Sequence, residues 1–463
     1  MIDKLKMQEK QVAAKQMLDH TVKQFTNPTE EFSRKWVTAI LFCVIFIGKD
    51  ILYFGTVNDL LLKISQIVMM LCCVFAGLYL IVHKIHLKRE TVYSWAFFGI
   101  LILLSAVFNW DIRLGYLYLI VVLAVCGMLL RIAKVDGIFE FYYKAMNVIS
   151  VVSVIAFVAQ KLFPQIATVF PIVYNSTGIQ FRFLVVTNLD DTYGTFLRNW
   201  GPFREPGVFQ LYVSISLIYG LFKKKQVSTV SILFHILAII TTFSTTGYIV
   251  LAIIILATVA QKKETMHNWE LYKKILIISC VGVVYLVFFT DVLFSSGAMS
   301  YASVFGKLFD GMSNNSMGSR MASVVVNVLM FFERPLFGGG MGYVDSRFGQ
   351  ICGEMYGDPQ LHNTNTIFIL LATFGLVVAA VAVAKIWLFI DEYFNAGNIS
   401  KLMLVGAYFC MLFCENVMYS VIVMFPLLYV SKTERRVVKS AIVFLQKKKL
   451  REWLRKILRW GER

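Results

Sequence analysis

The chain has 463 residues, of which 58% are hydrophobic and only 16% are charged, and its formal net charge is +17. A soluble globular protein of this length needs more charged surface, so the composition excludes an ordinary soluble enzyme and favours an integral membrane protein. The positive charge does not predict a nucleic-acid partner, because the basic residues form short runs between apolar segments, as the positive-inside rule expects of cytoplasmic loops.

The N-terminal segment, residues 1–35, is polar and rich in lysine. The first apolar run after it is long enough to stay in the membrane, so we predict no cleavable signal peptide. We expect segment 1–35 to be cytoplasmic and to contact the anionic surface of the bilayer.

A transmembrane domain is predicted over residues 36–431, where many apolar runs reach the roughly 20 residues that a helix needs to cross hydrocarbon. The twelve predicted spans lie near 36–54, 60–83, 91–109, 114–131, 145–163, 207–222, 227–243, 247–260, 274–294, 364–386, 400–415 and 417–431. The basic runs follow the even-numbered spans, which places them and both chain ends on the cytoplasmic side. The predicted fold class is an all-α polytopic membrane protein with about 12 transmembrane helices.

His235 is the clearest ionisable residue deep inside a predicted span. One interpretation is a histidine that is hydrogen-bonded between helices, and the other is a proton relay. A relay would require acidic partners at a similar depth, and the sequence shows none there.

Two outward connections are long, near 164–206 and 295–363, and long loops on a helical scaffold are where binding and catalysis usually reside. Their basic residues are almost all arginine, with a single lysine: Arg182, Arg198, Arg204, Arg320, Arg334, Arg347 and Lys307. A guanidinium group offers a planar set of donors that matches phosphate oxygens, so the group of arginines predicts an anionic ligand outside the membrane. The alternative for each single arginine is a salt bridge with a loop carboxylate: Glu205, Asp190, Asp191, Glu333 or Asp345.

The first loop ends in Arg198-Asn-Trp-Gly-Pro-Phe-Arg204-Glu-Pro-Gly207 and enters an apolar helix. Glu205 either caps that helix or serves as an acid or base at the mouth of a membrane cavity. The hydroxyl-rich stretch Thr241–Tyr248 predicts a tight outer turn between two spans.

The second loop contains Arg320, then a glycine-rich stretch from Phe332 to Gly342, and then His362-Asn363 directly before a span. The glycines lack the strand-before, helix-after context of a nucleotide-binding loop, so we expect them to allow a tight bend or the close approach of backbone to a ligand. His362 is either a polar residue at a helix start or a proton-exchanging group.

The C-terminal segment, residues 432–463, alternates apolar and basic residues at helical spacing. We predict a basic amphipathic tail on the cytoplasmic leaflet.

These segments resemble the O-antigen ligase and polysaccharide polymerase superfamily of bacterial envelope glycosyltransferases. The family pattern corresponds to Arg198–Pro206, Ser244–Gly247, Arg320, Pro335–Gly340 and His362-Asn363, in that order and in outer connections. The resemblance covers roughly residues 198–375, while the first five spans match only in general character. One departure is Gly207, where many members have asparagine.

The resemblance implies a membrane glycosyltransferase of the bacterial cytoplasmic membrane that uses an undecaprenyl-pyrophosphate-linked oligosaccharide as donor. Arg204 and Arg320 would bind the pyrophosphate with Arg198 and Arg334 in support, and Glu205 or His362 would activate the acceptor hydroxyl. No metal or other cofactor is expected, because arginines can stabilise the leaving group. The adjacent Asp190 and Asp191 are a weak metal candidate.

Three activities remain open at this point. A polymerase that joins repeat units is favoured, a ligase that transfers finished polymer to an acceptor is the first alternative, and a lipid-linked oligosaccharide flippase or transporter is the second. A flippase and a chain-length regulator of the same pathway are further partners that the polymerase function would imply. A transporter is expected to show inverted repeats, broken helices and charged groups near the midplane.

Overall fold

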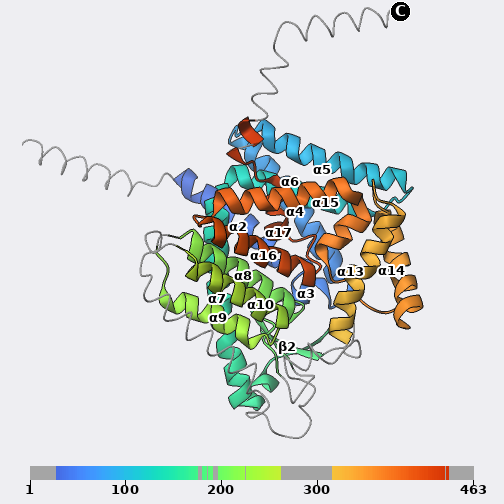
Figure 1. Ribbon diagram of the computed structural model, residues 1–463. Helices are drawn as coiled ribbons and strands as arrows, with labels where there is room; N and C mark the ends of the chain where they lie inside the picture. Colours follow the sequence, from blue (N-terminus) through green and yellow to red (C-terminus); the bar gives the residue numbers. More distant parts are fainter. Residues whose placement is uncertain are drawn as a thin grey trace, which may run out of the picture.

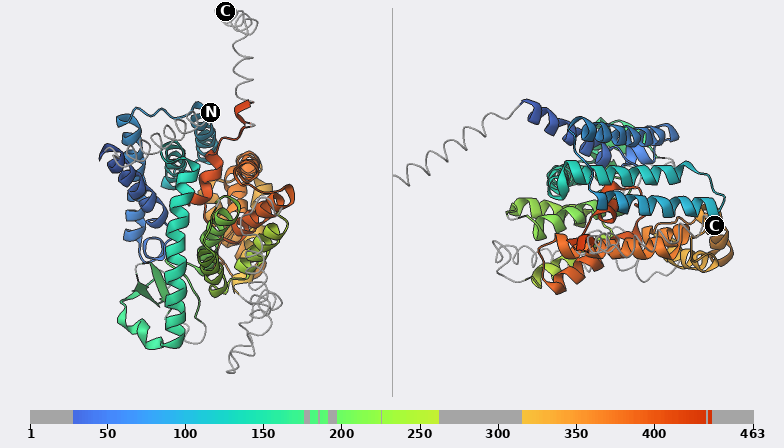
Figure 2. Two further views of the ribbon diagram at one scale, coloured as in Figure 1. Left: turned by 90° about the vertical axis from the view of Figure 1, so that its left-hand side faces the viewer. Right: turned by 90° about the horizontal axis from the view of Figure 1, so that it is seen from above.

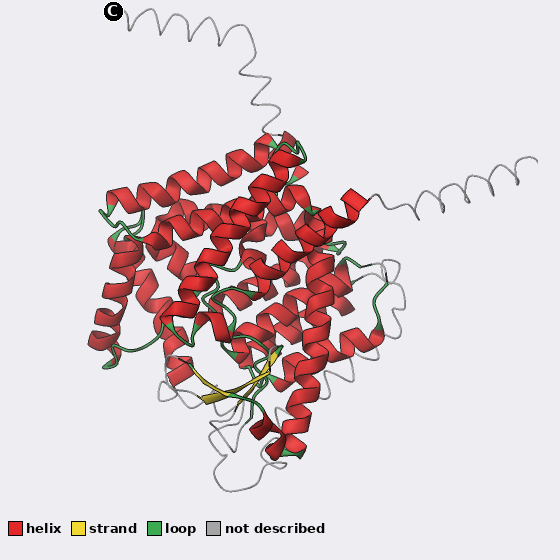
Figure 3. Ribbon diagram, turned by 180° about the vertical axis from the view of Figure 1, so that it is seen from behind, coloured by secondary structure: helices red, strands yellow, loops and turns green. Residues whose placement is uncertain are grey.

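The computed structural model describes residues 28–175, 180–184, 186–190, 197–224, 226–261, 315–432 and 434–436. The predicted span 274–294, most of segment 1–35 and nearly all of the C-terminal tail lie outside the described residues. The described part is mainly helical, with one small sheet (Figures 1 and 3).

The N-terminal half contains α2 (Pro28–Phe46), α3 (Leu52–Gly55), α4 (Asp59–Val82), α5 (Arg89–Phe108), α6 (Leu114–Ile132), α7 (Lys134–Leu162), the 3₁₀ helix η1 (Pro164–Val169), and strands β1 (Ile172–Tyr174), β2 (Gln180–Leu184) and β3 (Thr187–Asp190). The C-terminal half contains α8 (Pro206–Phe222), α9 (Thr229–Thr241), α10 (Thr245–Val259), α13 (Asn315–Glu333), α14 (Gly340–Tyr356), α15 (Thr366–Tyr393), α16 (Asn398–Cys414) and α17 (Val421–Leu428).

Five of the described helices are long and apolar enough to cross a membrane: α4, α5, α6, α7 and α15. Further apolar helices of the described part are shorter, and they are Lys35–Phe46 of α2, α8, α9, α10 and α16. These helices support a membrane-embedded helical protein. The count of twelve spans and the side on which each end lies remain predictions.

The helices are stacked in layers (Figure 2). The N-terminal helices in blue lie on one side, helices in teal lie in the middle, and the C-terminal helices in orange lie on the opposite side. In α6, 56% of the residues in the most apolar stretch are buried, whereas the share is 28% in α4 and in α5. Helix α6 therefore lies inside the bundle. Every residue of α8 is buried, so α8 is an interior helix of the C-terminal half.

His235 is hydrogen-bonded between helices, which is the first of its two interpretations. Its Nε2 is 2.9 Å from the Ser216 hydroxyl of α8, and its Nδ1 is 2.7 Å from the Ser231 carbonyl oxygen. The Tyr143 ring of α7 stacks on the imidazole, with ring centroids 5.3 Å apart. Both ring nitrogens therefore have partners in a structural setting.

The first long loop is not irregular throughout, because it contains η1 and a three-stranded antiparallel sheet in the order β1-β2-β3. Arg182 of β2 pairs with Ile172 of β1 and with Leu189 of β3. Phe183 of β2 stacks on Tyr53 of α3, with ring centroids 4.9 Å apart. The expectation of a purely helical protein therefore needs this correction: a small sheet packs against α3.

The second long loop forms two further helices in its described part, α13 and α14. Ala322, Val326 and Met330 recur at every fourth position of α13, so they share one face, and they pack against Val344 and Phe348 of α14. This spacing explains why the segment folds as a helical hairpin.

Helix α15 is broken at Gly375, whose φ of 80° and ψ of −176° are open essentially only to glycine. The stretch between α13 and α14 pairs with backbone groups at the break. The Leu376 N–H donates to the Pro335 carbonyl oxygen (2.9 Å), and the Gly339 N–H donates to the Ala372 carbonyl oxygen (2.8 Å).

The glycines at this break allow two backbones to touch. A Cβ at Gly338 would lie 2.3 Å from the Thr373 carbonyl group, and a Cβ at Gly375 would lie 2.2 Å from the Leu336 carbonyl oxygen. The Ser105 hydroxyl donates to the Thr373 carbonyl oxygen (2.8 Å). The glycine-rich stretch thus approaches the backbone of a helix of the same chain, whereas the approach of backbone to a ligand stays a prediction.

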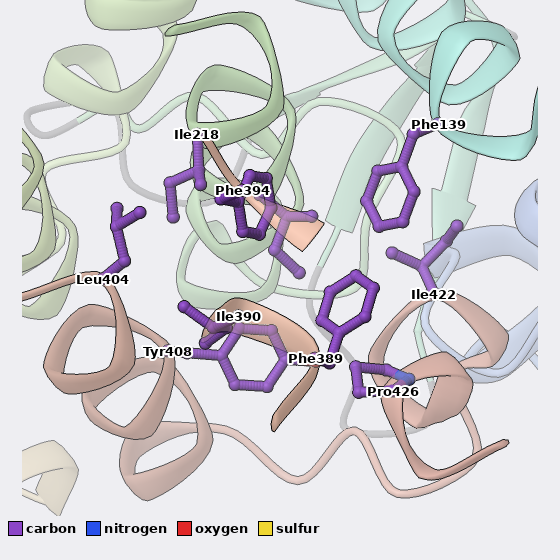
Figure 4. A pocket seen from close by; sticks show the side chains of 10 residues that line it. Phe139, Ile218, Phe389, Ile390, Phe394, Leu404, Tyr408, Ile422 and Pro426 are labelled. Atoms are coloured by element: carbon purple, nitrogen blue, oxygen red, sulfur yellow. The ribbon is translucent and has the colours of Figure 1, made fainter. Parts of the chain in front are cut away.

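An apolar pocket lies between α7, α8, α15, α16 and α17 (Figure 4). Phe139, Ile218 and Phe389 are among the side chains that line it. The hydroxyl of Tyr408, also in its wall, donates to the Val423 carbonyl oxygen (2.9 Å). The lining suits helix packing and does not suit a charged sugar-phosphate group.

Candidate functional site

Five charged side chains from distant parts of the sequence form one group, which we call the arginine–carboxylate cluster: Asp50, Arg204, Glu205, Arg320 and Glu415. They come from the α2–α3 connection, the start of α8, the first turns of α13 and the α16–α17 connection. Apart from Asp50 and Glu415, which fall within or at the end of predicted spans, these positions belong to the connections that the topology prediction places outside.

Arg204 joins several of these segments. Its Nη1 lies 3.0 Å from Oε1 of Glu205, and its Nε lies 3.7 Å from Oδ1 of Asp50. Its Nη2 donates to the backbone carbonyl oxygen of Asn416 (3.0 Å). The Tyr212 hydroxyl donates to the other Asp50 oxygen (2.8 Å), which fixes the orientation of that carboxyl.

Glu205 occupies the position before α8, but its side chain makes no capping hydrogen bond. Pro206 begins the helix, as the sequence predicts. The carboxyl of Glu205 is 48% exposed and pairs with Arg204. Glu205 thus holds the predicted capping position without a capping hydrogen bond from its side chain, and its carboxyl lies at the edge of the cluster.

Glu415 lies beyond the last residue of α16 and is 2% exposed. Its Oε1 lies 3.8 Å from Nη2 of Arg320 and, among the described residues, has no hydrogen-bond partner. A Cβ at Gly207 would lie 1.8 Å from the same oxygen. Burial raises the pKa of the Glu415 carboxyl above its ordinary value, the negative charge of Glu205 raises it further, and the positive charges of Arg320 and Arg204 oppose the rise.

The His362-Asn363 pair is held against the helix that carries Arg320. The Ser323 hydroxyl, one turn after Arg320, donates to the His362 carbonyl oxygen (3.0 Å). The Asn327 amide, one turn further, donates to Oδ1 of Asn363 (2.8 Å). The His362 side chain is exposed. The structure thus brings the predicted His-Asn pair close to one predicted arginine.

Arg198 has a different setting. Its Nε donates to the Thr242 carbonyl oxygen (2.9 Å) and its Nη2 donates to the Phe243 carbonyl oxygen (3.3 Å). Phe243 has a φ of 49° in the turn between α9 and α10. Ser244 follows and accepts a hydrogen bond from the Gly247 N–H at the start of α10. These contacts of Arg198 stabilise the predicted hydroxyl-rich turn.

Arg334 directly follows α13, at the end opposite Arg320. Its Nη1 donates to Oδ1 of Asn109 (2.7 Å), and its guanidinium lies 4.5 Å from the ring centroid of Tyr343. The rise of an α-helix separates the two arginines by about 20 Å along the axis. One pyrophosphate group therefore cannot contact both Arg320 and Arg334 in this conformation.

Sequence reasoning missed Asp50 and Glu415 as members of the cluster. Each is an acidic residue within or at the end of a predicted apolar span, and a charge in that position is costly unless it has a partner or a function. An acidic residue in such a position could therefore have indicated membership of the site from the sequence.

Within the described ranges, no group of three or more His, Cys, Asp or Glu side chains could hold a metal ion. No family model matches the sequence, and no curated protein is significantly similar to it. The described fold and the cluster thus show a helical, membrane-embedded protein with a partly buried group of arginines and carboxylates.

Proposed function

We propose that the chain is a polysaccharide polymerase that joins undecaprenyl-pyrophosphate-linked repeat units at the outer face of the bacterial cytoplasmic membrane, for a capsule, an exopolysaccharide or an O-antigen. The observation that carries the proposal is the grouping of Arg204 and Arg320 in one cluster. Arg320 Nη2 lies 3.8 Å from the Glu415 carboxyl, on which the charge of Arg204 also acts, and the His362-Asn363 pair is held on the helix of Arg320.

The proposed glycosyl transfer requires positive charge near the leaving pyrophosphate more than it requires a general acid. Pyrophosphate is a good leaving group, and its departure from the anomeric carbon develops negative charge on its oxygens. Arg204 and Arg320 stabilise that charge by about 2–4 kcal/mol each in a partly dry site. Neither side chain is fully exposed, at 19% and 25%, so water screens these interactions less than at an open surface.

The acceptor hydroxyl needs a proton acceptor, for which the proposal offers two groups. Glu205 is half-exposed beside Arg204 and accepts no hydrogen bond from the N-terminus of α8. His362 is exposed, and an imidazole nitrogen can act as a general base. Exchanging each for a non-titrating side chain distinguishes them.

The broken helix α15 is a feature that a transporter would also show, because broken helices form substrate sites in transporters. Here the backbone around the break is engaged by the stretch Pro335–Gly339 and by Ser105, so it does not present those groups to a cavity. This observation favours the enzyme over the transporter.

The experiment is a joining reaction with the purified full-length chain in lipid nanodiscs and lipid-linked repeat units as the only glycan substrate. The proposal predicts products of two and more repeat units, release of undecaprenyl pyrophosphate, and undiminished activity in excess EDTA. Absence of longer products, with the substrate intact, would reject the polymerase.

A further inference from the structure

Two buried polar atoms of opposite charge remain without a hydrogen bond in the described part of the cluster: Nε of Arg204 and Oε1 of Glu415. Buried polar groups are nearly always hydrogen-bonded, so such a pair at one site calls for an explanation. Arg204 Nε and Arg320 Nη2 meet their carboxylates only at 3.7 and 3.8 Å, beyond hydrogen-bonding distance. Nε of Arg204 is therefore a buried donor without a described partner, and Nη2 of Arg320 makes no hydrogen bond with the Glu415 carboxyl.

The Glu415 carboxyl occupies a position that suits an anion. Its Oε1 lies against Cα of Gly207, the second residue of α8, and next to Arg320. The first turn of a helix attracts negative charge through its free N–H groups and its dipole. Since Gly207 has no side chain, the carboxyl fills the space that any other residue at 207 would occupy.

The charges of the side chains around Glu415 determine whether an anion can bind in the cluster. The groups that act on Glu415 are Glu205, Arg204, Arg320 and Cys414, and Lys49 acts on Arg204 and Asp50. When the lysine, the two arginines and the three carboxyls of this group are ionised, their charges cancel: Lys49, Arg204 and Arg320 against Asp50, Glu205 and Glu415. An ionised Glu415 neutralises Arg320 and repels a phosphate oxygen, whereas a protonated Glu415 does neither.

We propose that Glu415 occupies the anion position of the cluster in the free protein, and that a pyrophosphate group binds Arg204 and Arg320 together with the uptake of one proton by Glu415. The choice of pyrophosphate rests on the proposed function. The proton comes from solvent and returns to solvent when the anion leaves, and no covalent bond changes. Glu415 is thus a positioning residue that couples anion binding to pH.

The experiment titrates the purified full-length chain with inorganic pyrophosphate in a calorimeter, without metal, at about pH 8.5, in two buffers of different ionisation enthalpy. The heat difference between the buffers gives the protons taken up. The wild type is expected to take up about one proton more per bound pyrophosphate than Glu415→Gln. Between about pH 7 and pH 9, the affinity of the wild type relative to Glu415→Gln should fall by up to about tenfold per pH unit.

Glu354→Gln is the matched control, because Glu354 is a 68% exposed carboxyl on α14 whose described ion pair is with Arg347, outside the cluster. It should show the wild-type proton uptake. Gly207→Ala is a second variant, in case glutamine at 415 disturbs folding. Its methyl group takes the place of Oε1, so its uptake should also fall below that of the wild type.

Equal uptake by the wild type and Glu415→Gln would overturn the inference, as would failure of the wild type to bind pyrophosphate. The proposed function fails separately. If the extra proton is measured but purified chain does not join lipid-linked repeat units, the polymerase is rejected while the proton-coupled anion site stands.

Discussion

Gly207→Ala tests the central contact of the arginine–carboxylate cluster. In an ordinary helical position this change is favourable by up to about 1 kcal/mol, because alanine restricts the unfolded chain and favours the helix. At 207 the new Cβ would lie 1.8 Å from Oε1 of Glu415 and 2.9 Å from its Cδ. We therefore expect Gly207→Ala to lower the free energy of unfolding and not to raise it.

The magnitude follows from the geometry. The carboxyl must move about 1.6 Å to restore an ordinary contact, and overpacking of this kind costs about 1–3 kcal/mol. Glu415 is 2% exposed, so the movement disturbs its contact with Arg320 or its packing. Because Glu415 is buried, we take the upper part of that cost, about 2–3 kcal/mol; subtracting a helix term of about 1 kcal/mol leaves a predicted net loss of about 1–2 kcal/mol in the free energy of unfolding.

The assay is unfolding of the full-length chain in mixed detergent micelles. Gly406→Ala on α16 is the matched control, because a Cβ at that position meets nothing within 4 Å, and it should be neutral or stabilising. Adding Glu415→Ala to Gly207→Ala removes the clash, so the two changes should couple by about 2 kcal/mol. Wild-type stability of Gly207→Ala, or additivity of the two changes, would refute the contact.

Three further predictions follow from the same geometry. Gly375→Ala should reduce the free energy of unfolding by at least about 3 kcal/mol in the same assay, because it combines a φ of 80° with a clash against the 335–339 backbone. Burial raises the pKa of the Glu415 carboxyl, so this group stabilises the folded state fully at a pH below the ordinary pKa of a glutamate. That stabilisation is lost as the pH rises through the raised pKa of the folded state. The unfolding temperature of the wild type should therefore fall with rising pH more than that of Glu415→Gln. Arg204→Ala should weaken pyrophosphate binding about tenfold or more by calorimetry, whereas Arg198→Ala should mainly lower the unfolding temperature, because the described hydrogen bonds of Arg198 go to backbone carbonyls of the α9–α10 turn.

Much of the helical framework could be predicted from hydrophobic runs alone, since α4, α5, α6, α7 and α15 all fall on predicted spans. The small sheet could not, because its strands are only three to five residues long and lie in a polar loop. Such short strands form only when a surface such as α3 and α7 is present to cover them.

The break in α15 also escaped prediction. Gly375 lies in an apolar run, where a single glycine is compatible with a continuous helix. What breaks the helix is a tertiary contact, since the 335–339 stretch supplies the hydrogen bonds that the helix gives up. A sequence pattern cannot show which distant backbone will arrive at a given residue.

The candidate site was predicted in part. The structure brings Arg204, Glu205 and Arg320 into one cluster and holds the His362-Asn363 pair on the helix of Arg320. It places Arg334 at the far end of α13, and the described hydrogen bonds of Arg198 lie in the α9–α10 turn. Arginine composition identified the group, but only three-dimensional contacts could decide which members meet.

The most direct test of the polymerase is analysis of the surface polysaccharide in a deletion strain of the organism that carries this chain, complemented with wild type, Arg320→Ala or Arg347→Ala. Arg347 is the matched control, because its described ion pairs are with Glu333 and Glu354, outside the cluster. Single repeat units are expected in the deletion strain, restored to polymer by wild type and Arg347→Ala but not by Arg320→Ala. Full-length polymer left on its lipid carrier would indicate a ligase, and repeat units held on the cytoplasmic side would indicate a flippase; either result would contradict the polymerase function.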